Sequence, residues 1–474
     1  MKNIQGDYRG ASAPDTIQYQ DSRHALFGRL MLVVILVSLV LAGCAGEAEP
    51  VPTSSPMPAG KYDSLKIETT LTAAERKAIF ESAWQQVNEL FYDPSFGGKD
   101  WQAIGEAYRK KLATVQDDTA FWFQLLNPML FELGVSHIGA LPAELSNQLS
   151  VESFANGSLG MDVRLLDGVP VVTRVLAGSP AEQAGLRTGY VITAIDGMMQ
   201  ADFAANNFNM PPYNERHKRA RAVVGMRSAF YGEVGAEVVI EYLDASNQVQ
   251  QARMQFAPRR DLSCGELDPA LPQFCAELEV RRLDNGIGYL RLSGFLEPVL
   301  EGMLQAIEDQ DDAPALIIDL RGNLGGVFPV RKAIASQLVG EPRLFMRYMG
   351  RDGALEAYLD PVSNPYPGEV MILVDETSVS SSEEFTGSLQ AMGRATVIGV
   401  QTPGNCLVMT LESLPGEAIL MVPYRQSVTP NGRVLEDNGV VPDFEVELDR
   451  GQLLQGFDAQ LEAAIEYATK QMKK

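Results

Sequence analysis

The sequence predicts a multidomain α/β protein with a helical N-terminal domain, a β-rich domain that contains one helix, and an α/β core built on a largely parallel sheet. Apolar residues recur at helical spacing between residues 72 and 133, and short strands separated by turn residues fill residues 158–259. After residue 286 strands alternate with helices. A chain of 474 residues is long enough for several such domains.

The chain is strongly acidic. It carries 39 lysines and arginines against 61 aspartates and glutamates, which gives a formal net charge of −22. No block rich in lysine or arginine follows the N-terminal region. Because nucleic acids are bound through basic surfaces, we expect no nucleic acid among the partners.

Residues 1–44 have the pattern of an export signal. An apolar run from Leu30 to Leu41 follows a few basic residues and is too short to span a bilayer comfortably. The run ends in Leu-Ala-Gly-Cys, which resembles the lipobox of bacterial lipoproteins, in which Cys44 becomes the lipidated first residue. The resemblance implies an extracytoplasmic protein anchored by lipid to the membrane of the cell envelope, with residues 45–64 as a Pro/Ser-rich tether. An uncleaved membrane anchor is the alternative.

Residues 65–150 are predicted to form the helical domain. Thr72 and Glu75 have the spacing of a capping box at the start of its first helix. Two further helices are expected over residues 101–112 and 119–133.

Ser136 and His137 follow the third predicted helix, in the run Gly-Val-Ser-His-Ile-Gly, on a loop or at the start of a strand. The chain has three histidines. His24 lies in the predicted signal and His217 in a polar insertion, so a catalytic imidazole of the mature protein is expected at His137. A structural role for this histidine is the alternative.

Residues 158–259 contain one of the most specific motifs of the chain. The run Gly-Ser-Pro-Ala-Glu-Gln-Ala-Gly-Leu-Arg-Thr-Gly, followed by Ile-Asp-Gly, closely resembles a PDZ domain. The resemblance implies a groove between a helix that begins near Pro180 and the strand after Gly160, with Gly160 and Met161 as substrate-binding residues. A peptide added there as an extra strand is held by backbone hydrogen bonds. Residues 201–228 would interrupt the domain, and a role as a spacer is the alternative.

Residues 260–285 are expected to connect the second and third domains. Cys264 and Cys275 bracket a Pro-containing loop in this connector and can form a local disulfide in an exported protein. Two free thiols are the alternative. Cys406 then has no predicted disulfide partner.

Residues 286–450 are predicted to form the α/β core, and residues 451–474 a C-terminal helix. The segment 315–320 is wholly apolar, as in sheets that are buried on both faces. Strands are expected at 287–292, 315–320, 370–374 and 395–399, with helices at 297–310, 330–338 and 381–392. Two later strands, at 408–411 and 418–423, are expected to close the sheet.

Three segments of the core point to acyl transfer. Asp-Leu-Arg-Gly-Asn-Leu-Gly-Gly, residues 319–326, follows the buried strand, where ligands of α/β sheets usually bind. Its paired glycines let backbone amides point at a developing oxyanion. Ser380 lies where a strand turns into a helix, close to the partial positive charge of the helix N-terminus. Glu436 lies in a third segment, Val-Leu-Glu-Asp-Asn-Gly-Val-Val-Pro-Asp.

Helix capping is the simpler role for the serines of the second segment. Ser380 with Glu383, and Ser381 with Glu384, both fit the S-x-x-E pattern of a capping box. We expect the roles to divide, with Ser380 as nucleophile and Ser381 or Ser382 holding the helix start together with the two glutamates.

The patterns D-L-R-x-N-x-G-G, S-x-S-x-S-E and G-V-x-P-D, in this order behind the PDZ-like piece, resemble the S41 family of serine peptidases, of the C-terminal-processing and tricorn types. The resemblance covers nearly the whole mature chain and implies a ClpP/crotonase-like core. In the C-terminal-processing branch the nucleophile corresponds to Ser380, and a lysine serves as general base. Asn405 stands at the lysine position, and a neutral amide cannot accept the proton of a hydroxyl. A serine–lysine mechanism is therefore not expected.

The tricorn branch uses a different set of residues, which this chain matches in Ser136, His137 and Glu436. The resemblance implies that Ser380 attacks the scissile carbonyl and that His137 takes its proton. Glu436 would orient the imidazole and stabilise its charged form, through Ser136.

The amides of Ser381 and of Gly325 or Gly326 are expected to bind the oxyanion. One histidine and scattered carboxylates give no ligand spacing, so no metal is expected, and no cofactor. The predicted function is that of an exported, lipid-anchored serine endopeptidase whose PDZ module selects or gates polypeptide substrates. The alternative is a binding or scaffold protein of the envelope with a lapsed site, which Asn405 and a Cys406 expected to be exposed would favour.

Overall fold

The computed structural model describes residues 71–142, 156–199, 214–259, 262–265 and 274–473. The predicted signal, Cys44 and the predicted tether lie outside the described residues. Within the described ranges, no helix combines the length and the apolar character needed to cross a membrane.

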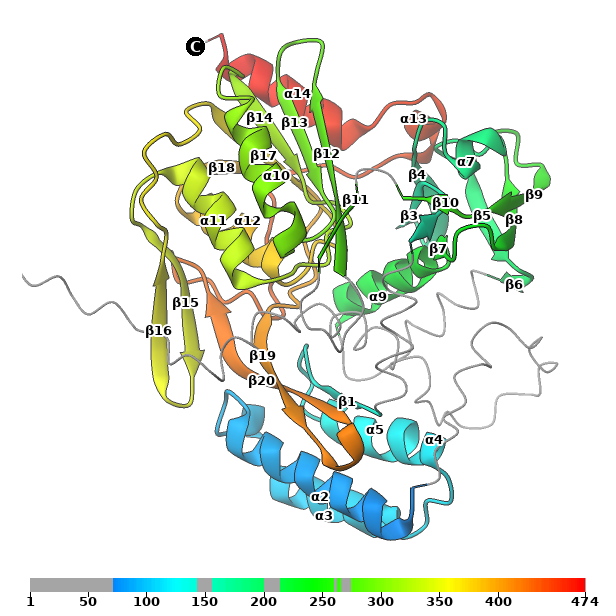
Figure 1. Cartoon of the computed structure of the whole chain (residues 1–474), viewed down its shortest axis with the longest axis vertical. Helices are drawn as coiled ribbons and strands as arrows, with labels where there is room; N and C mark the ends of the chain where they lie inside the picture. The colour runs from blue at the N-terminus through cyan, green and yellow to red at the C-terminus, as the bar shows by residue number, and fades with distance from the viewer. Residues whose placement is uncertain (1–70, 143–155, 200–213, 260–261, 266–273, 474) are drawn as a thin grey trace, which may run out of the picture.

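The helical domain begins at the predicted capping box (Figure 1). The backbone N–H of Glu75 donates to the Thr72 hydroxyl and that of Thr72 to the Glu75 carboxylate. The third predicted helix is interrupted by a π-helical turn, because Pro128 lacks the N–H that would continue the α-helical ladder. The helices are α2 (Ala73–Leu90), α3 (Trp101–Leu112), α4 (Asp118–Ala120), the π-helical turn η3 (Phe121–Leu126) and α5 (Asn127–Phe131).

The β-rich domain is an antiparallel sheet with the strand order β3-β4-β5-β8-β9. These strands span Met161–Leu166, Val169–Val175, Val191–Ile195, Glu237–Leu243 and Val249–Gln255. A further short strand, β2 (Gly157–Ser158), precedes them. β3 is therefore an end strand of the sheet.

The structure corrects which helix lies along the strand after Gly160. The predicted helix near Pro180 is α7 (Pro180–Gln183), which is only four residues long and contacts β9. A longer helix, α9 (Glu215–Ser228), lies along β3. The sequence placed α9 inside a polar insertion because its charged residues hide an apolar stripe of Ala222, Val223 and Met226, which are buried in the domain core.

The core contains a seven-stranded sheet with the order β11-β12-β13-β14-β17-β18-β21. The strands from β13 to β21 run parallel, as predicted, while β11 and β12 pair antiparallel at one edge. Part of the predicted connector at residues 260–285 thus forms these two edge strands. The strands span Leu262–Gly265, Phe274–Arg282, Gly288–Leu292, Ala315–Asp319, Glu369–Val374, Ala395–Gly399 and Phe444–Glu445.

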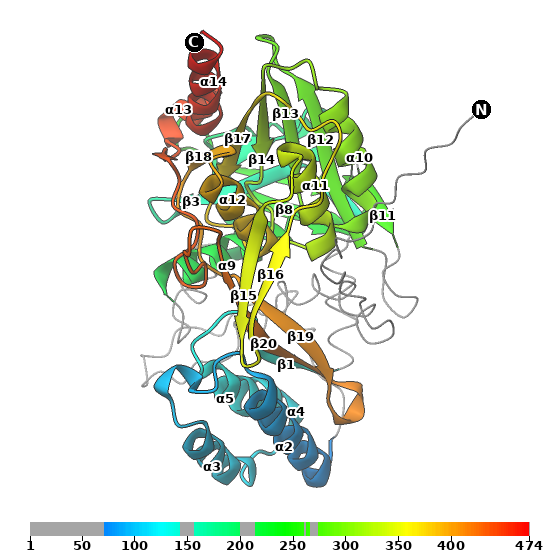
Figure 2. The ribbon, with the colours of Figure 1, turned by 90° about the vertical axis from the view of Figure 1, so that its left-hand side faces the viewer.

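Helices cover both faces of the core sheet (Figures 1 and 2). On one face lie α10 (Glu297–Glu308), α11 (Phe328–Val339) and α12 (Ser381–Ala391), and on the other lies α14 (Ala459–Gln471). The predicted single C-terminal helix is two helices, α13 (Arg450–Leu454) and α14, because the chain turns at Gly456 with φ +78°.

The two strands expected to close the core sheet belong instead to a second, antiparallel sheet (Figure 2). It contains β15 (Leu344–Gly350), β16 (Gly353–Tyr358), β19 (Leu407–Ser413) and β20 (Ile419–Val428). β20 leaves the core and pairs with β1 (Gly139–Leu141) of the helical domain. This pairing brings His137, two residues before β1, towards the core.

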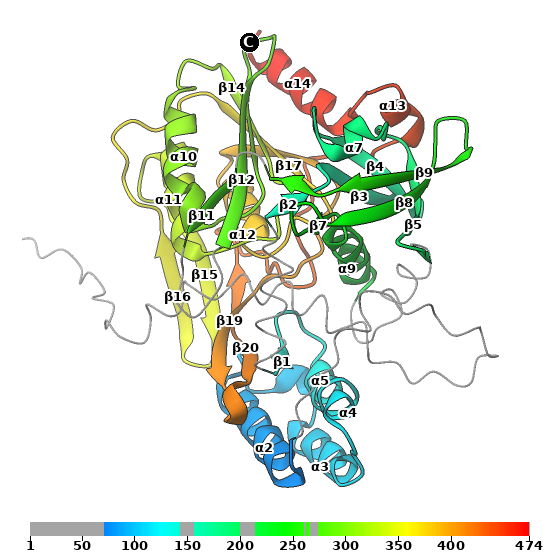
Figure 3. The ribbon, with the colours of Figure 1, turned by 45° about the vertical axis from the view of Figure 1, so that its right-hand side comes forward.

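The β-rich domain lies beside the core (Figure 3). Buried ion pairs join the two domains. The guanidinium group of Arg164, on β3, pairs with the carboxylates of Asp375 and Glu376, which follow β17. Asp162, also on β3, pairs with Arg291 of β13 at 2.9 Å. These contacts hold β3 and α9 on the side of the domain that faces the core.

Candidate active site

Ser380 lies at the turn between β17 and α12. It is the N-cap residue of α12, with φ 57° and ψ −117°, and only 2% of it is exposed. A residue with a side chain persists in this conformation only where neighbouring contacts hold it. Its hydroxyl therefore lies at the start of an eleven-residue helix, whose first amides carry partial positive charge.

Glu383 provides contacts that hold this turn. Its Oε2 accepts a hydrogen bond from the Ser380 amide (3.1 Å), and its Oε1 accepts from the Thr402 hydroxyl (2.6 Å) and the Gly404 amide (2.7 Å). Burial raises the pKa of Glu383 to about 7, against the opposing effect of these hydrogen bonds. Glu383 thus caps the helix and also fastens the loop at residues 402–405 to it.

Ser381 and Glu384 do not form the second capping box. The Ser381 hydroxyl donates to the carbonyl oxygen of Gly326 (2.6 Å) and accepts from the guanidinium of Arg331 (2.8 Å). The carboxylate of Glu384 forms an ion pair with the same arginine. These side chains tie the start of α12 to α11 and to the glycine loop.

The glycine loop meets the start of α12. Asn323 organises it by accepting hydrogen bonds from the Gly325 amide (2.8 Å) and the Ser382 hydroxyl (2.7 Å). A Cβ on Gly325 would lie 3.0 Å from the Ser381 nitrogen, so only glycine allows this approach. The Gly325 amide already donates its hydrogen bond to Asn323. Among the described residues nothing accepts the N–H of Gly326 or of Ser381, so these two amides are available for an oxyanion.

Glu436, Ser136 and His137 form a buried chain of hydrogen bonds. The Ser136 hydroxyl lies 2.8 Å from Oε2 of Glu436 and 2.7 Å from Nδ1 of His137. The Ser136 amide donates to Oε1 of Glu436 at 2.8 Å. Each of the three residues is 4% exposed. Because the helical domain supplies two of them and the core the third, the chain exists only when the two domains are joined.

The carboxyl group of Glu436 is close to its titration point at neutral pH. Burial raises its pKa to about 8, the negative charge of Asp437 adds to the increase, and the amides of Cys406 and Ser136 oppose it. Tyr92 faces the same group from the helical domain, and burial together with the charge of Glu436 raises the pKa of its hydroxyl. Glu436 therefore exchanges its proton within the physiological pH range.

His137 presents one unengaged nitrogen. Its Nδ1 meets Ser136, whereas its buried Nε2 has no hydrogen-bond partner among the described residues. Burial lowers the pKa of His137 to about 4, so the ring is neutral at pH 7. Its φ of 58° is a second strained backbone conformation in the site.

Cys406 connects the nucleophile to this chain. Its amide donates to Oε2 of Glu436 (2.8 Å), and its sulfur lies 3.6 Å from the carbonyl oxygen of Ser380. Cys406 is 1% exposed, so the expectation that it is exposed is wrong. Burial raises the pKa of its thiol well above the usual range, which disfavours a reactive thiolate.

Asn405 holds the nucleophile through its backbone. Its carbonyl oxygen accepts the Ser380 amide at 2.9 Å. Its side-chain oxygen is buried and has no hydrogen-bond partner in the described part of the chain. The position expected for lysine therefore carries no group that can act as a base.

The other predicted site residues among those described lie in the β-rich domain and at the edge of the core sheet. Gly160 precedes β3, where its amide donates to the Ser158 hydroxyl at 2.9 Å, and Met161 is the first residue of β3. Cys264 and Cys275 are joined by a disulfide between β11 and β12.

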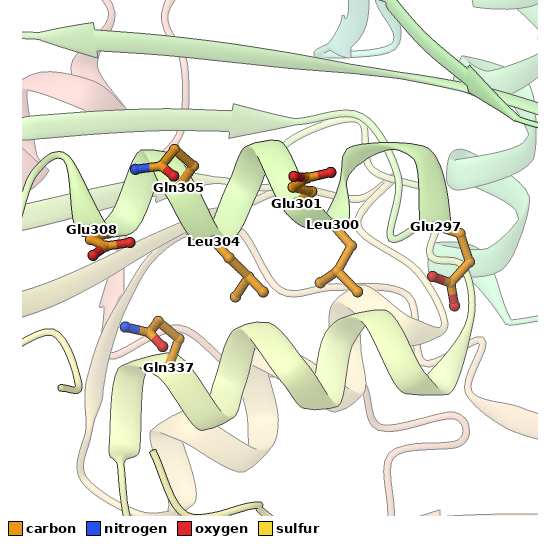
Figure 4. Close-up of a pocket in the computed structure, with 7 residues that line it drawn as sticks. All are labelled: Glu297, Leu300, Glu301, Leu304, Gln305, Glu308 and Gln337. Atoms are coloured by element: carbon orange, nitrogen blue, oxygen red, sulfur yellow. The ribbon is translucent and has the colours of Figure 1, made fainter. Parts of the chain in front are cut away.

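The surface of the described residues contains hollows on two sides of the core. One, of about 610 Å³, lies between the β-rich domain and the core, and its lining includes Arg164 and Thr377. The other, of about 460 Å³, lies between α10 and α11, where Leu300 and Leu304 point towards α11 between acidic side chains (Figure 4). None of the predicted site residues lines the second hollow.

The sequence did not single out Cys406 or Tyr92 as part of the site, and it assigned Glu383 to capping alone. Glu383 carried a signal in its S-x-x-E spacing, but its reach to the loop at 402–405 depends on tertiary structure. Cys406 is the residue after Asn405, and the only signal at this point of the sequence was the absence of a lysine. Tyr92 carried no local signal.

Comparison with protein-family models gives three matches in chain order. Residues 72–131 match the tricorn protease C1 domain, residues 171–199 match a PDZ domain, and residues 286–446 match peptidase family S41. The matches fall on the helical domain, the β-rich domain and the core.

Individual relatives agree with these matches. The chain is 26% identical over 409 residues to the carboxyl-terminal-processing protease of Synechocystis sp., covering 85% of this chain and 88% of that protein. It is 28% identical over 388 residues to a tricorn protease homolog of Streptomyces coelicolor, covering 79% of this chain and 30% of that protein. The fold is similar to that of a photosystem II D1 C-terminal processing protease, with a TM-score of 0.53 and 23% identity over 82% of this chain and 99% of that one.

The burial of His137 predicts an imidazole that stays neutral in mildly acidic solution. Its pKa is lowered from 6.5 to about 4, so its NMR signals should show no conversion to imidazolium between about pH 8 and pH 5. The unfolded chain binds this proton at higher pH than the folded chain. The stability that the neutral ring contributes is therefore complete above about pH 6.5 and is lost as the pH falls towards 4.

A His137→Gln variant assigns the signal, because the buried ring of His217 has a pKa that is also lowered to about 4. A midpoint near 6.5 for His137 would contradict the buried, neutral ring.

Proposed function

Since residues 286–446 belong to peptidase family S41 and the chain is accordingly a serine peptidase, we propose that it is an exported endopeptidase that cuts polypeptides with Ser380 as nucleophile and with His137 and Glu436 as its partners. The observation that carries this proposal is the buried hydrogen-bond chain from Glu436 through Ser136 to His137. A serine that only capped a helix would require no such chain.

The Ser136 hydroxyl couples the charge of Glu436 to the tautomer of His137. When Glu436 is ionised, the hydroxyl donates to the carboxylate and accepts the Nδ1–H of the ring. Nε2 then carries a lone pair and can take the proton of Ser380. When Glu436 is protonated, the hydroxyl is free to donate to Nδ1, and Nε2 then carries the proton and cannot act as a base.

The reaction follows from this arrangement. Ser380 Oγ attacks the scissile carbonyl carbon as its proton passes to Nε2 of His137, and ionised Glu436 stabilises the imidazolium through Ser136. The amides of Gly326 and Ser381 receive the oxyanion, a contribution of about 3 kcal/mol from each donor. The imidazolium gives its proton to the leaving amine, and a water molecule then hydrolyses the acyl-enzyme by the same steps.

We assign substrate recognition to the PDZ domain. β3 is an end strand and begins at Met161, next to Gly160, so an extended peptide can add to its edge alongside α9. The hollow of about 610 Å³ between the PDZ domain and the core includes Thr377, three residues before Ser380, in its lining. Such a hollow suits a peptide that passes from the PDZ domain to the nucleophile.

Export and lipid attachment at Cys44 complete the proposal. They rest on the apolar run and the Leu-Ala-Gly-Cys ending. The disulfide between Cys264 and Cys275 suits an oxidising compartment outside the cytoplasm.

Labelling with a fluorophosphonate probe tests the nucleophile. Wild type should react, and Ser380→Ala should lose the label entirely, because Ser380 is the proposed nucleophile and the nearby amides of Gly326 and Ser381 have no other acceptor among the described residues. Ser378→Ala, two residues upstream, is the matched control and should still label. If wild type reacts no better than Ser380→Ala, the chain is instead a binding or scaffold protein of the same fold.

Replacement of Asn405 tests whether the residue at the lysine position takes part in catalysis. Asn405→Ala keeps the backbone carbonyl that accepts the Ser380 amide, so activity should stay within a few-fold of wild type. The rate of casein cleavage measures this. A loss greater than about 100-fold would mean that the amide side chain takes part in the chemistry.

A further inference from the structure

α9 of the PDZ domain contacts the three loops of the core that build the proposed active site. Its first turn meets Asp437 and the loop at 403–404, its middle packs on Val379, and its last turn reaches Gly322. These loops belong to a different domain from α9, which lies at the face of the PDZ domain nearest the core (Figure 3). These contacts therefore depend on how the PDZ domain packs against the core.

Three side chains of the first turn converge on Asp437. Nδ2 of Asn214, the N-cap residue, donates to Oδ1 of Asp437 at 3.0 Å. The guanidinium of Arg216 donates to the backbone carbonyl of Asp437. Nε2 of His217 lies 3.7 Å from Oδ1 of Asp437. Asp437 has φ 60°, which a residue with a side chain keeps only when neighbours hold it.

The same turn holds the loop that carries Asn405. The ring of His217, only 1% exposed, lies beside the backbone of Pro403 and Gly404. Gly404 in turn accepts the Asp437 amide at 2.9 Å. His217 is thus buried between two loops of the other domain.

Both loops lead directly to the reacting groups. Asp437 is the neighbour of Glu436, and Gly404 is followed by Asn405, whose carbonyl accepts the Ser380 amide. The Gly404 amide also donates to Glu383, which caps the helix behind the nucleophile. A shift of the first turn of α9 would therefore move Glu436 and Ser380 relative to each other.

The rest of α9 reaches the remaining parts of the site. Val224 is buried against Val379, the residue before Ser380, and against Leu324 of the glycine loop. The guanidinium of Arg227 donates to the carbonyl oxygen of Gly322 at 3.1 Å, at the start of that loop. α9 thus contacts the loop next to Glu436, the loop that carries Ser380 and the glycine loop.

We propose that α9 is a positioning element of the peptidase site, with His217 as its principal positioning residue, and that the docked PDZ domain holds the site in its reactive arrangement. This inference rests on the proposed function. It follows that a ligand or substitution that lifts α9 from the core slows the reaction of Ser380 without removing any group that touches the substrate.

The test compares three variants of α9 in the full-length protein with a fluorophosphonate probe. His217→Phe keeps a ring and removes its two nitrogen atoms, whereas His217→Gln restores a polar group at this position. Lys218→Ala is the matched control, because Lys218 pairs with Glu215 on the same helix. Displacing a reacting group by about 1 Å costs about 100-fold. We therefore expect the maximal labelling rate of His217→Phe to fall by about tenfold or more, with the half-saturating probe concentration unchanged.

The conservative variant separates positioning from stability. His217→Gln should recover most of the rate, and Lys218→Ala should match wild type, with similar melting temperatures for all. Equal rates for His217→Phe and wild type, or a loss that Lys218→Ala shares, would overturn the inference and leave the proposed function standing. A wild-type protein that does not label at all would overturn both.

Discussion

The Ser136 hydroxyl, held between Glu436 and His137, is the contact on which the site depends. A hydroxyl can donate only one proton, so its direction sets which ring nitrogen of His137 is free. The carboxyl of Glu436 sets that direction, and burial brings its pKa to about 8. In the proposed mechanism, a proton on Glu436 of the core thus decides whether His137 of the helical domain can act as the base for Ser380.

This contact is possible because of the fold. The pairing of β1 with β20 carries Ser136 and His137 to the core. Three residues of the site, His137, Ser380 and Asp437, have positive φ, at a typical cost of about 1–3 kcal/mol each. His137 and Asp437 lie where domains meet, whereas Ser380 is held by Glu383 and Asn405 within the core. The helical domain alone lacks Glu436, and the core alone lacks Ser136 and His137.

The sequence predicted the three-domain order, the α2 capping box, and the parallel strands around Ser380, because each depends on local spacing. It could not predict that β20 pairs with β1, since that pairing joins residues about 280 positions apart and has no local pattern. It also misjudged α9, whose apolar stripe is hidden among charged residues, and therefore missed the contacts of His217 with the core. The buried position of Cys406 likewise follows from packing and not from its neighbours in sequence.

The pH dependence of Ser380 labelling by a fluorophosphonate tests the central claim most directly. In the proposed mechanism the ionised form of Glu436 is the active one, so the second-order rate constant of wild type should rise with pH through a midpoint of about 8. Glu436→Gln removes the titrating group and should give a slow rate that stays flat from about pH 6 to pH 9. The same midpoint in Glu436→Gln, or a wild-type midpoint near 6.5 that belongs to an ordinary histidine, would contradict the account.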